Sequence, residues 1–239
     1  MRICVISYSG TVGKTTIVAH LFYSRLKKAL VFAIETVNET AASLGIPVIQ
    51  ISAEHYDAFY KQILTARDAI VDLGASNVED FVAGLLRYEG SQIEFDYFVI
   101  PVLSGTKEQK ECIAMVRLLN SMGIEADRIR IVFNRVRHEV AEEFQLLLNY
   151  VAKEGGCWVN QEAAIFENEL YDMLMIRRIS LGDILADTTN YRELARAFPA
   201  DGDKKLLAHY TSMHLMQSLA KGVSKNLERV YNLLIPEEK

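Results

Sequence analysis

Residues 3–16 read ICVISYSGTVGKTT, and the rest of the architecture can be worked out from this segment. Its first part, Ile3–Ser7, is apolar and rich in β-branched residues, which is typical of a buried strand. A short loop follows and ends in Gly13-Lys14-Thr15, and apolar residues then recur at helical spacing as far as Lys28. A strand, a loop ending in Gly-Lys-Thr and a helix together form a P-loop, which binds phosphate.

The residue types in this loop suit the phosphates of a nucleotide. Glycines let successive backbone N–H groups turn toward phosphate oxygens, and the N-terminus of the helix adds partial positive charge. We expect Lys14 to reach the β and γ phosphates of ATP and the Thr15 hydroxyl to ligate Mg²⁺. The strict pattern has a glycine where this chain has Tyr8, so a loop that keeps the fold without the ligand is the alternative. The predicted nucleotide-binding residues of the loop are Gly10, Thr11, Val12, Gly13, Lys14, Thr15 and Thr16.

Short apolar runs alternate with helix-length amphipathic stretches along the chain, as in βαβ units around a parallel sheet. The sequence therefore predicts an α/β fold, with a mostly parallel sheet and helices on both faces. The expected strands are Ile3–Ser7, Ala29–Ile34, Val48–Ile51, Ala69–Leu73, Tyr97–Val102 and Ile129–Phe133. The expected helices are Lys14–Lys28, Ala53–Ala66, Val78–Tyr88, Lys107–Met122 and Val140–Lys153.

A different pattern occupies the C-terminal region. From Leu206 to Leu234 apolar residues recur about every 3.5 residues, which predicts one long amphipathic helix. Pro236 ends it, and the segment Phe198–Asp203 is a hinge candidate before it. We expect a P-loop nucleotide-binding domain over residues 1–198 and a helix over 204–236 packed on the same domain. Contact with a partner helix, a dimer mate or a membrane surface is the alternative.

Composition restricts the class of protein further. The chain has 239 residues, half of them hydrophobic, which is enough for one core without disulfides or metals. Its net charge of -5 argues against a surface devoted wholly to nucleic acid. Three scattered cysteines favour free thiols in a reducing compartment, and the histidines show no zinc-ligand spacing. No apolar run has the length of a signal peptide core or a membrane span, so we expect a cytoplasmic protein.

A carboxylate at the end of a second strand could complete the magnesium site. Asp72 follows Ala69-Ile70-Val71 and precedes Leu73-Gly74, which is the layout of a Walker B strand. We expect Asp72 to hold Mg²⁺ together with Thr15, through the water shell of the ion. An aspartate that caps the next turn is the alternative.

Three segments together resemble a known class of ATPases. Ser9–Thr15 looks like the deviant Walker A motif, K-G-G-x-G-K-[ST], of ParA/MinD ATPases. Within that class, Val5–Thr16, Ile34–Asn38 and Val71–Asn77 most resemble StbB-type plasmid stability proteins, with similarity as far as about Arg192 by motif order. The resemblance implies a P-loop NTPase fold that uses ATP and Mg²⁺.

Two positions depart from the family's loop. Thr11 replaces the second glycine, which the loop can absorb if this position does not need a positive φ. Ser9 replaces the family's signature lysine, which reaches across a dimer to the partner's nucleotide. The usual ATP-sandwich dimer therefore does not follow from this sequence.

The resemblance also implies a catalytic role for Glu35, beside Lys14 and Asp72. Glu35 stands where the family carries the first of two acidic switch residues, but the second position is Val37. Asn38 or Glu39 could substitute for it. We expect weak ATPase activity at most and leave hydrolysis open, with Glu35 as a solvated loop charge the alternative.

A further resemblance concerns the strand Ile131-Val132-Phe133, which ends in Asn134. In the family an asparagine at this place reads the adenine edge, and an amide suits that role because it offers a donor beside an acceptor. The alternative is a plain turn residue.

By resemblance, the chain would be a Mg-ATP-dependent switch in plasmid stability, partition or positioning, with a link to conjugation as one form of this role. A small DNA-binding partner protein and a homodimer are the expected partners. Direct DNA contact by a set of basic residues is an option, with a solvated face the alternative. The set is Arg128, Arg130, Arg135, Arg137 and His138, with Arg177 and Arg178 later in the chain. Two rival functions stay open: a module that binds nucleotide without hydrolysis, and a small-molecule enzyme like dethiobiotin synthetase.

Overall fold

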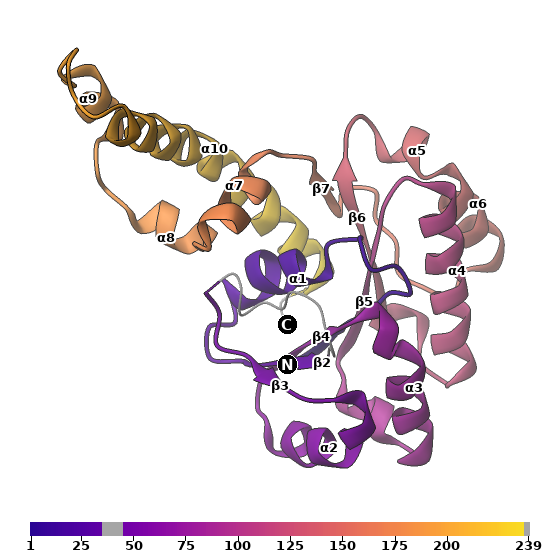
Figure 1. Cartoon of the computed structure of the whole chain (residues 1–239). Coiled ribbons are helices and arrows are strands. Elements are labelled where there is room, and N and C mark those ends of the chain that lie inside the picture. The colour runs from indigo at the N-terminus through magenta and orange to yellow at the C-terminus, as the bar shows by residue number, and fades with distance from the viewer. Residues whose placement is uncertain (35–44, 237–239) are drawn as a thin grey trace.

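A computed structural model describes residues 1–34 and 45–236 of the chain. Within them, seven strands form one sheet in the order β3-β2-β4-β1-β5-β6-β7, and all paired strands are parallel (Figure 1). The predicted mostly parallel α/β sheet is confirmed. The strands are β1 Arg2–Val5, β2 Leu30–Ile34, β3 Ile49–Gln50, β4 Ala69–Leu73, β5 Tyr97–Val102, β6 Ile129–Val136 and β7 Ala164–Phe166.

Strand β1 lies in the interior of the sheet, between β4 and β5. The chain first builds β2, β3 and β4 on one side of β1 and then crosses to β5 on the other side. Because the strands are parallel, their carboxyl ends share one edge, where Val5 of β1 pairs with Asp72 of β4. In such sheets ligands bind at this edge where the strand order reverses. The P-loop after β1 is at that position.

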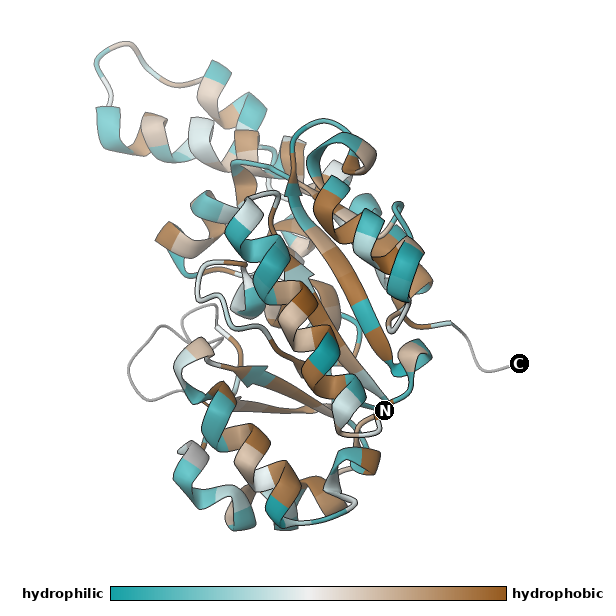
Figure 2. Cartoon of the chain, turned by 90° about the vertical axis from the view of Figure 1, so that its right-hand side faces the viewer, coloured by the Kyte–Doolittle hydropathy of each residue, from teal (hydrophilic) through white to brown (hydrophobic). Residues whose placement is uncertain are grey.

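Alternate residues of β1 face two separate cores, as the period of two in a strand requires. Ile3 and Val5 pack on one face of the sheet, and Cys4 packs on the other. The Cys4 face is covered by α2 Tyr56–Thr65, α3 Val78–Arg87, α4 Thr106–Ser121 and α6 Gln145–Glu154. The Ile3 face is covered by α1 Lys14–Ile17, the π-helix Val18–Tyr23, α7 Leu170–Arg177, α8 Leu181–Ala186 and α10 Lys204–Leu234. Figure 2 shows the apolar strands between these layers, so the predicted covering of both faces is confirmed.

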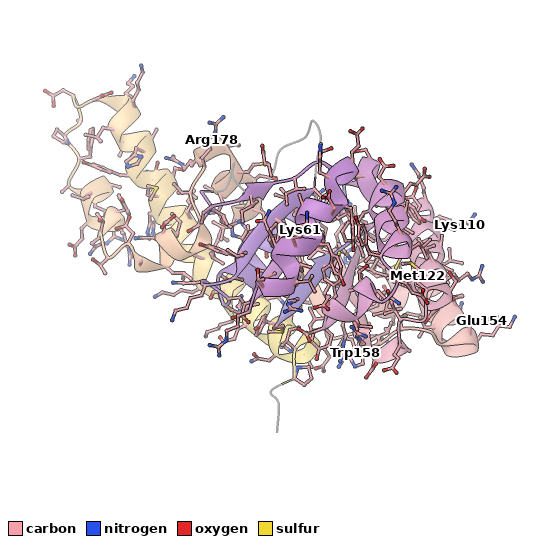
Figure 3. All side chains as sticks on the ribbon, turned by 90° about the horizontal axis from the view of Figure 1, so that it is seen from below. Lys61, Lys110, Met122, Glu154, Trp158 and Arg178 are labelled. Carbon is pink, nitrogen blue, oxygen red and sulfur yellow. The ribbon has the colours of Figure 1, made fainter. Side chains whose placement is uncertain are left out.

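The predicted long C-terminal helix is α10, whose 31 residues correspond to about 46 Å. Its second half packs on the sheet through Val223, Leu227 and Val230. The start of this helix projects from the body together with α9 Tyr191–Arg196, away from the end that carries Lys110 and Glu154 (Figures 1 and 3). Among the described helices, none combines the length and apolarity needed to cross a membrane. Exposed large apolar side chains on α7–α10 are Met175, Ile176, Leu185, Leu194, Leu206 and Leu215.

Several helices differ from the sequence prediction. The helix expected over 14–28 turns into a π-helix at Val18 and ends at Tyr23. The helix expected over 140–153 is divided into α5 Val140–Glu143 and α6, because Phe144 leaves helical geometry. The ring centroid of Phe144 lies 4.7 Å from that of Phe133. Strand β7 and helices α7, α8 and α9 were not predicted. The 3₁₀ turns are Ala53–His55, Ala75–Asn77, Ser91–Glu94 and Ala126–Arg128.

The three cysteines are free and buried, as the scattered pattern predicts. Burial raises the pKa of the Cys157 thiol to about 12. Burial, and to a smaller degree the charge of Asp72, raises the pKa of the Cys4 thiol. These thiols are therefore protonated at neutral pH and act as small apolar groups.

Two helical glycines offer a test of packing around α2 and α3. A Cβ at Gly84 in α3 would lie 2.3 Å from Cγ of Tyr56, whereas a Cβ at Gly222 in α10 would meet no atom within 4 Å. We expect Gly84→Ala to destabilise the fold by about 1–3 kcal/mol, because the buried ring must shift. Gly222→Ala is the matched control and should stabilise by about 0.5–1 kcal/mol through helix propensity. Urea unfolding of both variants measures this, and equal effects would contradict the packing.

Candidate nucleotide-binding site

The lysine of the P-loop lies beneath the loop rather than in solvent. Only 5% of Lys14 is exposed. Its ammonium group donates to the carbonyl oxygen of Ser9 at 2.7 Å and to that of Ser7 at 3.4 Å. The Ser9 N–H in turn donates to the Ser7 hydroxyl at 3.2 Å. The positive charge is therefore held at the centre of the loop, where phosphate oxygens would approach.

Backbone conformation in the loop depends on one glycine. Gly13 has a φ of 82°, and its carbonyl accepts the N–H of Ile17 at 3.0 Å, which starts α1. Gly10 has no such constraint, and a Cβ there would meet no atom within 4 Å. Thr11 is not among the described non-glycine residues with a positive φ, so the loop accepts threonine in place of the family's glycine. Open space beside Gly10 is what a close approach of phosphate to the backbone requires.

The two predicted magnesium ligands are in direct contact. The Thr15 hydroxyl at the start of α1 donates to Oδ2 of Asp72 at 2.8 Å, and Asp72 is 5% exposed. Hydroxyl and carboxylate oxygens are hard ligands of the kind that Mg²⁺ prefers, and Mg²⁺ is usually held by one or two carboxylates, waters and substrate phosphates. Among residues 1–34 and 45–236 no group of three or more His, Cys, Asp and Glu could hold a metal by itself. The donor set therefore fits an ion that arrives with a phosphate ligand.

Asn134 reaches the same loop from β6. Its Nδ2 donates to the carbonyl oxygen of Val12 at 2.7 Å, and the residue is 6% exposed. The register of β6 against β7 shifts between Asn134 and Val136, and Arg135 between them has a φ of 52°. The structure thus brings Lys14, Thr15, Asp72 and Asn134 to one edge of the sheet.

The two residues that depart from the P-loop pattern have structural places of their own. Tyr8 packs against the core that α3 covers, and burial, followed by the charge of Glu79, raises the pKa of its phenol. Ser9 is almost fully buried, and its carbonyl holds Lys14. Both substitutions are therefore compatible with an intact phosphate loop.

Several expected residues are not in this group. Glu35, with Val37, Asn38 and Glu39, lies outside the described residues. Conversely, two buried residues were not singled out from the sequence: Ser7, whose carbonyl and hydroxyl organise the loop, and Asn77 after β4. Serine and asparagine at strand ends are common turn residues, so no sequence signal distinguishes these two.

Three of the arginines near β6 contact other parts of the protein. Arg128 donates to backbone carbonyls, including that of Phe95. Arg130 is buried, with its guanidinium carbon 4.9 Å from the ring centroid of Tyr97 and 4.8 Å from that of Trp158, which Figure 3 labels. Arg137 forms two hydrogen bonds with Glu167, at 2.8 and 3.0 Å.

Comparison with known proteins supports the fold. No protein-family model matches the chain, and no curated protein sequence matches it significantly. MinD, a cell division ATPase of Pyrococcus furiosus, has a TM-score of 0.56 at 13% identity, over 97% of this chain and 98% of that chain. Apo McdA of Cyanothece has a TM-score of 0.55 at 16% identity, over 77% and 92%. A Cyanothece McdA variant in complex with ATP has a TM-score of 0.52 at 15% identity, over 95% and 96%. The chain therefore has the P-loop fold of MinD-like ATPases.

The two loop glycines should respond differently to alanine. Gly13→Ala places a Cβ 2.6 Å from Nδ2 of Asn134 on a backbone with positive φ, whereas Gly10→Ala meets open space. We expect Gly13→Ala to destabilise the fold by about 1–3 kcal/mol and Gly10→Ala to leave stability within about 0.5 kcal/mol. Thermal unfolding of both variants tests this. A Gly13→Ala variant as stable as wild type would show that the loop conformation is different.

Proposed function

We propose that this chain is a Mg-ATP-dependent switch of the ParA/MinD type. The observation that carries the proposal is the contact between Thr15 and Asp72, beside the buried Lys14, at the carboxyl edge of β1 and β4. A nucleoside triphosphate and its magnesium ion require a hydroxyl, a carboxylate and an ammonium group at this edge of the sheet. The fold shared with ATPases of known structure supports the same reading.

Each group of the site has a distinct task. Backbone N–H groups of residues 10–16 would surround the β and γ phosphates, and Lys14 would neutralise part of their charge. Thr15 and Asp72 would hold Mg²⁺, which when bound neutralises and orients the phosphate oxygens. Asp72 and the segment 35–39, with Glu35 as the proposed catalytic residue, would respond to the γ phosphate and change the affinity for a partner.

Ser9 favours a second candidate, a module that binds nucleotide without turnover. The resemblance to the family places its dimer-crossing lysine at position 9, and here that residue is a nearly buried serine. We expect slow hydrolysis or none, and no dimer that depends on this lysine. A homodimer formed through other surfaces is compatible with this candidate.

The biological role follows from the resemblance of motifs alone. Plasmid stability, partition or positioning by a StbB-like protein, with a link to conjugation, is the role we propose. A small DNA-binding protein is the proposed partner. The exposed apolar side chains on α7–α10, with Ile176 82% exposed, provide a surface for such a protein contact.

Removing the loop lysine tests nucleotide binding. We expect Lys14→Ala to weaken Mg-ATP binding at least about a hundredfold, because a buried charge that pairs with phosphates is lost. Titration calorimetry on wild type and variant measures the affinity, and phosphate release on the same samples measures turnover. Lys110→Ala, which removes an exposed lysine of α4, is the control and should bind like wild type.

Binding without phosphate release in wild type would favour the module without turnover. Absence of binding in wild type would overturn the proposal and make the loop a structural remnant.

Magnesium dependence tests the pair on α1 and β4. For wild type we expect ATP affinity to rise at least about tenfold when Mg²⁺ is added, and for Thr15→Val and Asp72→Asn we expect this gain to be largely lost. Titrations with Mg²⁺ and with EDTA measure the ratio. An undiminished gain in both variants would show that the ion is held elsewhere. Thr65→Val, an exposed threonine on α2, is the control for the loss of a hydroxyl.

A further inference from the structure

We infer that Asn134 is a positioning residue that holds the P-loop in its phosphate-binding shape. This inference rests on the proposed nucleotide site and assigns one of its parts. The observation behind it is the hydrogen bond from Nδ2 of Asn134 to the carbonyl oxygen of Val12, at 2.7 Å. Donor and acceptor are 122 positions apart in sequence, so the bond ties the loop to a different strand.

The bond from Asn134 lies next to the point where the loop turns into α1. Val12 immediately precedes Gly13, the residue whose positive φ turns the chain into α1. The amide also lies against Gly13 itself, since a Cβ there would be 2.6 Å from Nδ2. Ser7 and Lys14 bind the loop to its own flanks, whereas Asn134 fixes its turn against β6. Loss of the amide would free the peptide that sets the direction of the N–H groups.

Strand β6 is shaped to deliver this amide. In a regular strand Val136 would face the same side as Asn134, the side of α1. The irregularity between the two instead places Val136 in the core on the opposite face and leaves Arg135 exposed with a φ of 52°. A β-bulge of this kind re-aims side chains, and a non-glycine residue persists in such a conformation only where its surroundings demand it. The register of the strand therefore shifts directly after the residue that holds the loop.

One N–H of the Asn134 amide donates to Val12, and the residue is 6% exposed. The amide also carries a second N–H and a carbonyl oxygen. The part of its contribution to affinity that acts through the phosphate loop should be felt by ligands that carry no base.

The chain contains a matched control for this bond. Asn120 on α4 donates through Nδ2 to the carbonyl oxygen of Gly156 at 3.0 Å. Gly156 has a φ of 86°, and a Cβ there would also lie 2.6 Å from the amide nitrogen. The two asparagines thus make the same kind of contact with a left-handed glycine segment, one at the P-loop and one outside the proposed site.

Hydrogen exchange on the protein without nucleotide tests the inference directly. We expect Asn134→Ala to raise amide exchange across residues 8–14 at least about fivefold, because a buried acceptor loses its donor. Asn120→Ala should leave this segment unchanged. Asn134→Asp, which keeps the shape and removes the N–H donor, is a second variant in case alanine impairs folding. Unchanged exchange in a folded Asn134 variant would overturn the inference, whether or not the protein binds ATP.

Binding of Mg-ATP and of Mg-tripolyphosphate, which has no base, separates the two roles of the amide. We expect Asn134→Ala to weaken both ligands by a similar factor of about five to ten, and Asn120→Ala to weaken neither. Loss confined to ATP would assign Asn134 to the base and overturn the inference. Failure of wild type to bind ATP would overturn the proposed function instead, while the exchange measurement would still decide the role of Asn134.

Discussion

Parallel pairing of β1 with β4 is the constraint on which the site depends. The register places Val5 beside Asp72, so the end of one strand and the carboxylate of the next reach the same edge of the sheet. The loop that follows β1 must cross this edge to return into α1, and its first helical turn then presents Thr15 to Asp72. A shift of one residue in this pairing would turn Asp72 to the opposite face.

The burial of Lys14 and Asp72 makes this arrangement of β1, β4 and the loop energetically costly to disrupt. Lys14 and Asp72 lie almost fully buried, where a charge is tolerated only with close polar partners. The carbonyl oxygens of Ser7 and Ser9 receive the ammonium group, and the Thr15 hydroxyl donates to the carboxylate. These partners come from the loop and from the first turn of α1, so the loop's shape and the charges it holds stabilise each other. Polar groups arranged in advance in this way need little rearrangement to bind phosphate.

Sequence patterns were most informative where local chemistry dictates structure. Strands 69–73 and 97–102 have the predicted bounds because apolar runs buried on both faces end at polar residues. Strand β7 has three residues and α8 and α9 have six each, too few for a periodic pattern to appear. The division at Phe144 depends on a ring packing against Phe133, and the bond from Asn134 to Val12 depends on a bulge and on a partner far away in sequence. Such tertiary contacts do not change the local periodicity of the sequence, so they could not be predicted from it.

Tyr8 and Ser9 depart from the P-loop pattern, but their side chains do not form the part of the loop that surrounds phosphate. A phosphate cradle is built mainly from backbone N–H groups, whose direction depends on Gly13 and its neighbours rather than on the side chains at positions 8 and 9. Tyr8 extends onto the core and Ser9 is enclosed, so neither side chain occupies the open space beside Gly10. Position 9 carries no long cation, whereas the class that the sequence resembles has a lysine there that acts on a second protomer. In the proposed function, nucleotide binding and dimer-dependent hydrolysis are therefore separable, and the serine at position 9 bears on the second.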